Sequence, residues 1–216
     1  MSMINLTSRP GVPTTPAVLI WLGSGAVLIT LCVLFVDRAA STWSHAELHR
    51  PALAVHITRL AGWRYPSTAA ALVLIAALVS RITGRELGPI WRAAIAAAVA
   101  TLVATIAVTF VKYGCGREWP ETWVQNNPSW IGNHAYGFTP FHGGEGYESC
   151  PSGHTTRMAA PGAVLWRRLP ALRVLWVLPA AIVAVALVAA NFHFVGDCVA
   201  GAYLGVACAA LVMMVI

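Results

Sequence analysis

The residues best suited to chemistry lie in the stretch 150–156, CPSGHTT, where a polar, glycine-rich segment meets an apolar one. Proline fixes one backbone angle, Ser152 is a favourable N-cap, and Gly153 lets a ligand approach the main chain. A helix that starts here therefore presents free N–H groups that can bind an anion. His154 adds a side chain that exchanges protons near neutral pH, which chemistry on the anion needs. The alternative is an ordinary helix start with a capping serine.

A second candidate pair lies near the end of the chain. His193 and Asp197 are four residues apart, so on a continuing helix they share a face, and the carboxylate can orient one imidazole nitrogen. Taken alone, such a pair is more often structural. Combined with His154 at an anion-binding turn, it indicates phosphoryl transfer, in which His193 attacks the phosphorus and His154 protonates the departing alkoxide.

The composition places this chemistry in a membrane. Hydrophobic residues make up 58% of the 216 residues and charged residues only 10%, and the mean hydropathy is +0.69. The net charge of +6 comes from scattered basic residues without a Lys/Arg run, so the expected partners are anionic membrane lipids and not nucleic acid. The five cysteines lack metal-type spacing, and Cys115 and Cys150 share a polar segment where a disulfide could form.

Apolar segments predict an all-α, polytopic membrane protein that forms one domain over residues 1–216. Residues 1–16 are polar and proline-rich and are expected to form a flexible tail. Six spans are predicted at 17–36, 66–80, 93–111, 154–166, 174–194 and 198–216. The charged and apolar mixture between the first two, residues 37–65, is typical of a helix in the membrane interface.

Arg157 lies inside the fourth predicted span, because the nine residues 158–166 alone are too short to cross the membrane. An arginine at that depth indicates a functional site. The alternative is that its side chain extends to the interface. No metal site is predicted, since the interfacial histidines His45, His49 and His56 have no cysteine or suitable carboxylate beside them.

The third and fourth spans are joined by a long polar segment, residues 112–153. A loop of this length is usually functional or disordered, and its aromatic content argues for an active-site loop. We expect its aromatic and histidine side chains to form a lid that selects the substrate, although tryptophans also gather at the interface of any membrane protein. The candidate lid residues are Trp119, Trp123, Trp130, His134, Tyr136, Phe138 and His142.

The distribution of basic residues favours one orientation. Seven arginines, at positions 9, 81, 85, 92, 167, 168 and 173, lie on the side of the two short loops, against six basic residues on the other side. The positive-inside rule then places both chain ends in the cytoplasm and the long loop outside. The Ala- and Arg-rich, Lys-poor composition indicates a GC-rich bacterial genome, so we expect a cytoplasmic membrane with the active site facing the periplasm or exterior.

These motifs resemble those of the type 2 phosphatidic acid phosphatase family, which is related in fold to the vanadium haloperoxidases. The family pattern contains Lys, six residues and Arg-Pro, then Pro-Ser-Gly-His, then Ser-Arg, five residues, His, three residues and Asp. This chain matches it at Lys112, Pro120, residues 151–154, His193 and Asp197. The family also has six spans with the motifs on one face, so the resemblance covers most of the chain.

The resemblance implies a role for each matched residue. His193 would form a phosphohistidine, Asp197 would orient it, and His154 would be the general acid. No metal ion or other cofactor takes part, so positive side chains must stabilise the charge of the transition state. The phosphate oxygens would be bound by Lys112, Ser152 and the Gly153 amide.

Two positions depart from the family pattern. The first motif arginine is Trp119 here, and the Ser-Arg pair is Ala186-Leu187. We hypothesise that Arg117 and Arg157 supply the missing positive charge, because one lies two residues before Trp119 and the other lies one turn into the fourth span.

The function predicted is metal-independent hydrolysis of a lipid phosphate or diphosphate at the outer membrane face. By resemblance, the candidate substrates are phosphatidate, phosphatidylglycerophosphate and polyprenyl diphosphate. One alternative keeps the phosphohistidine and passes the group to another lipid or sugar. The other, prompted by the two missing cations, is a lipid-headgroup-binding or carrier protein without turnover.

Overall fold

The computed structural model of the chain describes residues 15–123 and 125–216. The predicted tail therefore lies, up to residue 14, outside the described part. Within that part every regular element is a helix, and the only strand-like pairs are isolated bridges in the long loop. The all-α prediction is confirmed.

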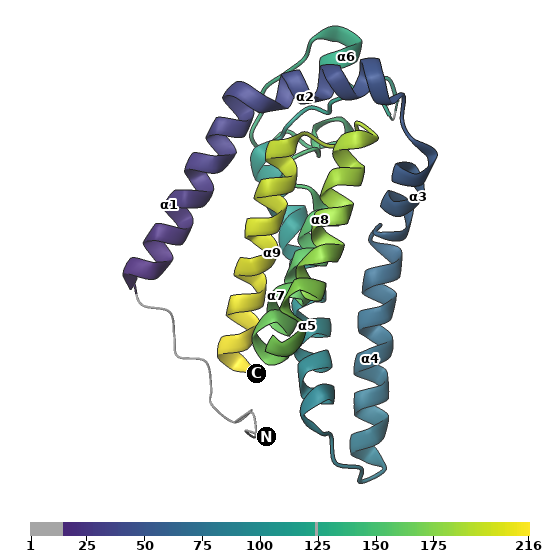
Figure 1. Cartoon of the computed structure of the whole chain (residues 1–216), viewed down its shortest axis with the longest axis vertical. Helices are drawn as coiled ribbons and strands as arrows, with labels where there is room; N and C mark the ends of the chain where they lie inside the picture. Colours follow the sequence, from purple (N-terminus) through teal and green to yellow (C-terminus); the bar gives the residue numbers. More distant parts are fainter. Residues whose placement is uncertain (1–14, 124) are drawn as a thin grey trace.

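The N-terminal third of the chain forms three helical segments. The first runs continuously through α1 (Thr15–Leu31), the π-helical turn η1 (Cys32–Val36), α2 (Asp37–Trp43) and a second π-helical turn η2 (Ser44–Leu48). Figure 1 shows α1 leaning away from the bundle and α2 crossing its end. The other two segments are α3 (Ala52–Leu60) and α4 (Arg64–Ile82), so the interfacial region of the sequence is divided between α2, η2 and α3.

The rest of the chain builds the helical bundle. Its long helices are α5 (Pro89–Cys115), α7 (Gly153–Arg168), α8 (Arg173–Ala189) and α9 (Val195–Val215), and its short ones are α6 (Trp130–Asn133), η3 (Glu145–Tyr147) and η4 (Pro170–Leu172). α7 packs against α5, α8 and α9 (Figure 1). The core between α5, α7 and α9 consists mainly of alanines such as Ala100, Ala160 and Ala209, which let the backbones approach closely.

Five helical stretches of the described chain are long and apolar enough to cross a membrane: Pro16–Leu48, Ala52–Ile82, Pro89–Cys115, Pro170–Ala189 and Val195–Val215. The fourth predicted span, which forms α7, has only 16 residues, and at 1.5 Å per residue it is shorter than the ~30 Å hydrocarbon core. Its neighbours α5, α8 and α9 cover it, so Arg157 is surrounded by protein. The two arginine-rich loops, α4–α5 and α7–α8, lie at the end of the bundle away from α2 and α6 (Figure 1).

The contact between α7 and α9 depends on Gly205. A Cβ atom added there would lie 2.6 Å from the carbonyl oxygen of Thr156 and 2.8 Å from Cβ of Ala159. We expect Gly205→Ala to lower the free energy of unfolding by about 1–3 kcal/mol through overpacking. The measurement is thermal unfolding in detergent micelles. Gly23→Ala on α1, where no atom of the described residues lies within 4 Å, is the control; equal unfolding temperatures for the two variants would contradict the prediction.

Candidate active site

The predicted anion-binding turn forms the start of α7. Ser152 is the N-cap, and its Oγ accepts a hydrogen bond from the backbone N–H of Thr155 (3.4 Å), so the predicted cap is confirmed. The backbone N–H of Ser152 donates to the carbonyl oxygen of Asp197 (2.9 Å), which joins the start of α7 to the start of α9. Ser152 is fully buried, and its hydroxyl is occupied by the cap. It is therefore Gly153, and not the Ser152 side chain, that lines the neighbouring cavity.

His193 lies in the turn between α8 and α9. A continuing helix is not what places this pair on one face, because α8 ends at Ala189, five residues before the predicted end of the fifth span at 194, and α9 begins at Val195. Asp197 is instead the third residue of α9, where its Oδ2 accepts the backbone N–H of Phe194 (3.0 Å). The turn brings Nδ1 of His193 to 3.5 Å from the same Oδ2. The pairing is thus produced by a capped helix start, and both side chains are buried.

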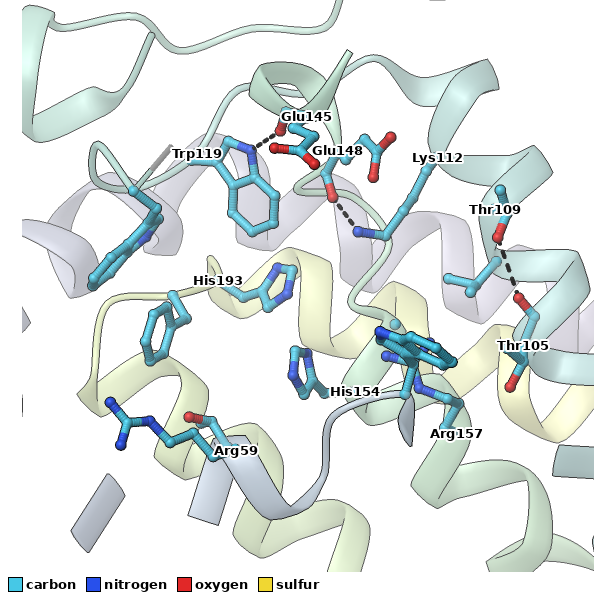
Figure 2. Close-up of a pocket in the computed structure, with 16 residues that line it drawn as sticks. Arg59, Thr105, Thr109, Lys112, Trp119, Glu145, Glu148, His154, Arg157 and His193 are labelled. Atoms are coloured by element: carbon cyan, nitrogen blue, oxygen red, sulfur yellow. Dashed lines mark hydrogen bonds between the residues drawn. The ribbon is translucent and has the colours of Figure 1, made fainter. Parts of the chain in front are cut away.

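His154 and His193 meet across a cavity of about 670 Å³. Their ring centroids are 6.0 Å apart, close enough for both rings to contact one phosphate group. Figure 2 shows the two rings near each other, with Lys112 and Trp119 on the side of the long loop. Lys112 lies on the last turn of α5, and its Nζ donates to the carbonyl oxygen of Glu148. The structure thus gathers three of the predicted motifs at one cavity.

Arg157 is the buried cation of this cavity. Its side chain is only 8% exposed, and in the described part of the chain its Nε has no hydrogen-bond partner. A Cβ added at Gly153 would lie 3.0 Å from Nη1 and 3.1 Å from Nη2 of Arg157, so the guanidinium packs closely against the start of α7. The arginine and the free N–H groups of the helix start therefore face the same space.

Arg117 does not line the cavity, contrary to the phosphate-binding role predicted for it. The side chain is fully buried, and its two terminal nitrogens donate to Asp197 and Asp37. Gly116, at φ 58°, ends α5 in the left-handed conformation that glycine adopts readily, and this turn directs Arg117 away from the cavity. Burial disfavours its charge, but the two carboxylates outweigh this effect and raise the pKa of Arg117 above its ordinary value.

The predicted lid divides into two groups. Trp119 and Trp123 line the cavity, and the ring of Trp119 lies 5.1 Å from that of His193. Trp130, His134 and His142 do not line it, so the structure does not support their place in the lid. Trp130 donates to Thr42 on α2, the ring of His134 meets that of Trp130 edge to face, and the ring of His142 packs at a tilt against Tyr147. The other two aromatic candidates, Tyr136 and Phe138, pack around Arg117.

Several residues of the cavity are not recognisable from the sequence pattern. Arg59 and Trp63 enter from α3 and the turn after it, and Glu145 and Glu148 enter from the loop (Figure 2). The two carboxylates partly offset the positive charge of Arg59, Lys112 and Arg157. The acidic residues of the loop can be read from the sequence, but the docking of α3 against α8 is a tertiary contact without a local sequence signal.

The environment of His193 favours its neutral form. Burial lowers the pKa of His193 below its ordinary value, although the adjacent Asp197 acts in the opposite direction. A neutral imidazole has a free lone pair at neutral pH, as a nucleophile requires. Elsewhere in the loop, Cys115 and Cys150, like the other three cysteines, are free thiols in this structure.

Comparisons with known proteins agree with this geometry. A sequence model described as the PAP2 superfamily matches residues 93–216. Among solved structures, the crystal structure of the first transmembrane PAP2 type phosphatidylglycerolphosphate phosphatase from Bacillus subtilis matches with a TM-score of 0.59 and 20% identity, over 90% of this chain and 91% of that chain. A search of curated proteins finds no significant match. Because the matched region exceeds half of the chain and contains all three motifs, the protein belongs to the PAP2 superfamily.

Proposed function

We propose that this integral membrane protein hydrolyses a lipid phosphate or diphosphate through a phosphohistidine on His193. The observation that carries the proposal is the placement of His154 and His193 across one cavity, next to the start of α7 and the buried Arg157. A neutral histidine, a second histidine and a cation around an anion-binding turn together supply the nucleophile, the acid and the charge stabilisation that phosphoryl transfer needs.

The chemistry proceeds in two steps. Nε2 of His193 attacks the phosphorus and the bond from phosphorus to the lipid oxygen breaks, while His154 donates a proton to the departing alkoxide. Burial lowers the pKa of His154, so the negative charge of the bound phosphate is what keeps this imidazole protonated for the step. The imidazole becomes cationic, and Asp197 beside Nδ1 stabilises that charge. A water molecule then attacks the phosphohistidine, with His154 accepting its proton, and releases inorganic phosphate and neutral His193.

The walls of the cavity favour a lipid substrate. Thr105 and Val108 line it about two turns and one turn before Lys112 on α5, toward the middle of a helix long and apolar enough to span a membrane. An acyl or prenyl chain can therefore stay between membrane helices while its phosphate reaches the histidines. The fold shared with a phosphatidylglycerolphosphate phosphatase supports a phosphomonoester on a lipid, and the arginine-rich loops at the opposite end of the bundle support an active site outside the cytoplasm.

Phosphate release in the presence of a metal chelator tests this proposal. We expect the purified protein in detergent micelles to release inorganic phosphate from at least one of phosphatidate, phosphatidylglycerophosphate and polyprenyl diphosphate with EDTA present. Glycerol 3-phosphate, which lacks the apolar chain, should react at least about 10-fold more slowly, because burial of an apolar chain contributes about 0.8 kcal/mol per CH₂. Restoration of activity only by added Zn²⁺ or Mg²⁺ would contradict the mechanism. Transfer of labelled phosphate to a second lipid would identify a transferase. Binding of a lipid phosphate without release of inorganic phosphate would identify a carrier.

A further inference from the structure

A buried charge cluster lies behind the His193–Asp197 pair, on the side away from the cavity. Nη1 of Arg117 donates to Oδ1 of Asp197 (2.6 Å), and Nη2 donates to Oδ2 of Asp37 (2.8 Å). Each of the three charged residues is 0% exposed. Charges taken out of water persist only when they are paired and hydrogen-bonded, so this cluster must act as one unit.

Asp37 is held as firmly as the arginine. Its Oδ1 accepts the backbone N–H of Gly196 at the start of α9 (2.7 Å). The Arg117 guanidinium carbon lies 5.1 Å from the ring centroid of Tyr136 and 4.4 Å from that of Phe194. Burial raises the pKa of Tyr136 to about 12, and its hydroxyl donates to the carbonyl oxygen of Val33. These contacts fix the guanidinium against Asp197 and prevent it from reaching a phosphate in the cavity.

The hydrogen bonds to Asp197 leave its carboxylate one orientation. Oδ1 accepts from Arg117, and Oδ2 accepts from the Ser149 hydroxyl (2.5 Å) and from the backbone N–H of Phe194. The cluster contains two carboxylates and one guanidinium, so its net charge is −1. A positive charge that appears on His193 during phosphoryl transfer neutralises it.

We propose that Arg117 and Asp37 are positioning residues that hold Asp197 beside His193 and set how strongly the Asp197 charge acts on the imidazole. This inference rests on the proposed function, because it assigns His193 the attack on phosphorus. It gives the N-terminal helix a part in the site, since Asp37 lies outside the region 93–216 that matches the family. It also replaces the hypothesis that Arg117 binds the phosphate.

The two roles of Arg117 differ in what a substitution does to His193. The charged and titratable groups around His193 are Asp197 from α9, His154 and Arg157 from α7, Lys112 from α5, and Glu145 and Glu148 from the long loop. Loss of the Arg117 charge leaves Asp197 unneutralised, so the imidazolium is favoured and the pKa of His193 rises. Loss of the Asp37 charge removes a negative group from the cluster, so the pKa of His193 falls. If Arg117 instead bound the phosphate, its removal would raise KM, and Asp37→Asn would leave the pKa of His193 unchanged.

The experiment measures the pKa of His193 directly and by kinetics. Protein labelled with ¹⁵N-histidine is titrated by NMR in detergent micelles, with the His193 signal assigned from its absence in His193→Gln. The acidic limb of the pH profile of kcat/KM is measured in parallel. We expect a shift on the order of one pH unit upward for Arg117→Gln and downward for Asp37→Asn. We also expect kcat of Arg117→Gln to fall at least about 10-fold with KM little changed.

Conservative and control variants keep the test decisive. Arg117→Lys keeps the charge and should leave the pKa of His193 near the wild-type value. Arg38→Gln removes the neighbouring exposed arginine, which contacts rings of the loop and not Asp197, and should change neither readout. If Arg117→Gln does not fold, the contrast between an unchanged pKa of His193 in Arg117→Lys and a lowered one in Asp37→Asn still decides.

An unchanged His193 pKa in Asp37→Asn, together with a raised KM and an unchanged kcat in Arg117→Gln, would overturn the inference and restore Arg117 as a phosphate ligand. If the pKa of His193 is unchanged in Asp37→Asn alone, Asp37 is not a positioning residue and Arg117 remains one. Because the NMR titration needs no turnover, it separates this inference from the proposed function. A wild-type protein that releases no phosphate from any lipid would refute the proposed function, whatever the titration gives.

Discussion

His193→Ala is expected to reduce phosphate release by at least about 1000-fold, the scale seen when a covalent nucleophile is removed. The remaining activity would come from Arg157 and the start of α7, which can still bind and polarise the phosphate. KM should change little, because the imidazole attacks only in the transition state. The measurement is phosphate release at saturating lipid phosphate with EDTA present.

The matched control is His134→Ala. This exposed histidine contacts Trp130 edge to face in the long loop, outside the cavity, so its removal should leave activity within about 2-fold of the wild type. Labelled substrate gives a second readout: the phosphohistidine should be trapped on the wild-type protein by rapid denaturation and should be absent from His193→Ala. Equal turnover of wild type and His193→Ala, or a trapped label that persists in the variant, would contradict the nucleophile assignment.

The parts of the site that could be predicted are those set by short-range sequence. The start of α7 follows from a proline, a capping serine and a glycine within four residues, and the structure contains that helix start at the predicted position. Five of the six predicted spans lie in helices long and apolar enough to cross a membrane, because long apolar runs form helices there, and the fourth, 154–166, forms the shorter α7. The meeting of the three motifs also follows from topology, since up-and-down helices bring alternate connections to the same membrane face.

The parts that could not be predicted depend on side-chain direction and on distant contacts. Arg117 and Trp119 are two residues apart, and spacing alone gives no reason to prefer Trp119 for the cavity wall and Arg117 for the buried cluster. The direction is set by the turn at Gly116 and by Asp37, 80 residues earlier in the chain. Likewise, the pairing of His193 with Asp197 was predicted for the wrong local reason, since a helix start replaces the continuous helix.

The cavity holds few cations for its phosphate, and this makes Arg157 decisive. Lys112 already donates to a backbone carbonyl and lies near Glu148, while Arg59 is on the exposed rim. Arg157, in contrast, is buried beside the anion-binding turn with Nε unpartnered in the described chain. An unpaired buried cation is costly unless an anion joins it, so the site is arranged for a ligand charge.

Arg157→Ala should therefore reduce kcat by about 100- to 1000-fold, as does the loss of one preorganised group that stabilises transition-state charge. Arg157→Lys should recover part of this loss, because a lysine keeps the charge but not the planar, two-pronged geometry of the guanidinium. Inhibition by vanadate, which adopts the five-coordinate geometry of phosphoryl transfer, should weaken in parallel with kcat. Arg167→Ala, on the exposed face at the far end of the same helix, is the control and should retain activity.

The double variant Trp119→Arg/Arg157→Ala decides whether the two positions serve the same charge. Trp119 lies on the cavity wall next to His193, so an arginine there can reach a phosphate held between the two histidines. If Arg157 replaces the missing motif arginine, Trp119→Arg should restore at least about 10-fold of the activity lost in Arg157→Ala, the equivalent of 1.4 kcal/mol. If the double variant recovers activity and Trp119→Arg alone gains little, one guanidinium in the cavity is sufficient for full activity. If Arg157→Ala has wild-type kcat and vanadate affinity, Arg157 does not take part in catalysis, and Lys112 and the helix start must stabilise the transferred phosphoryl group without it.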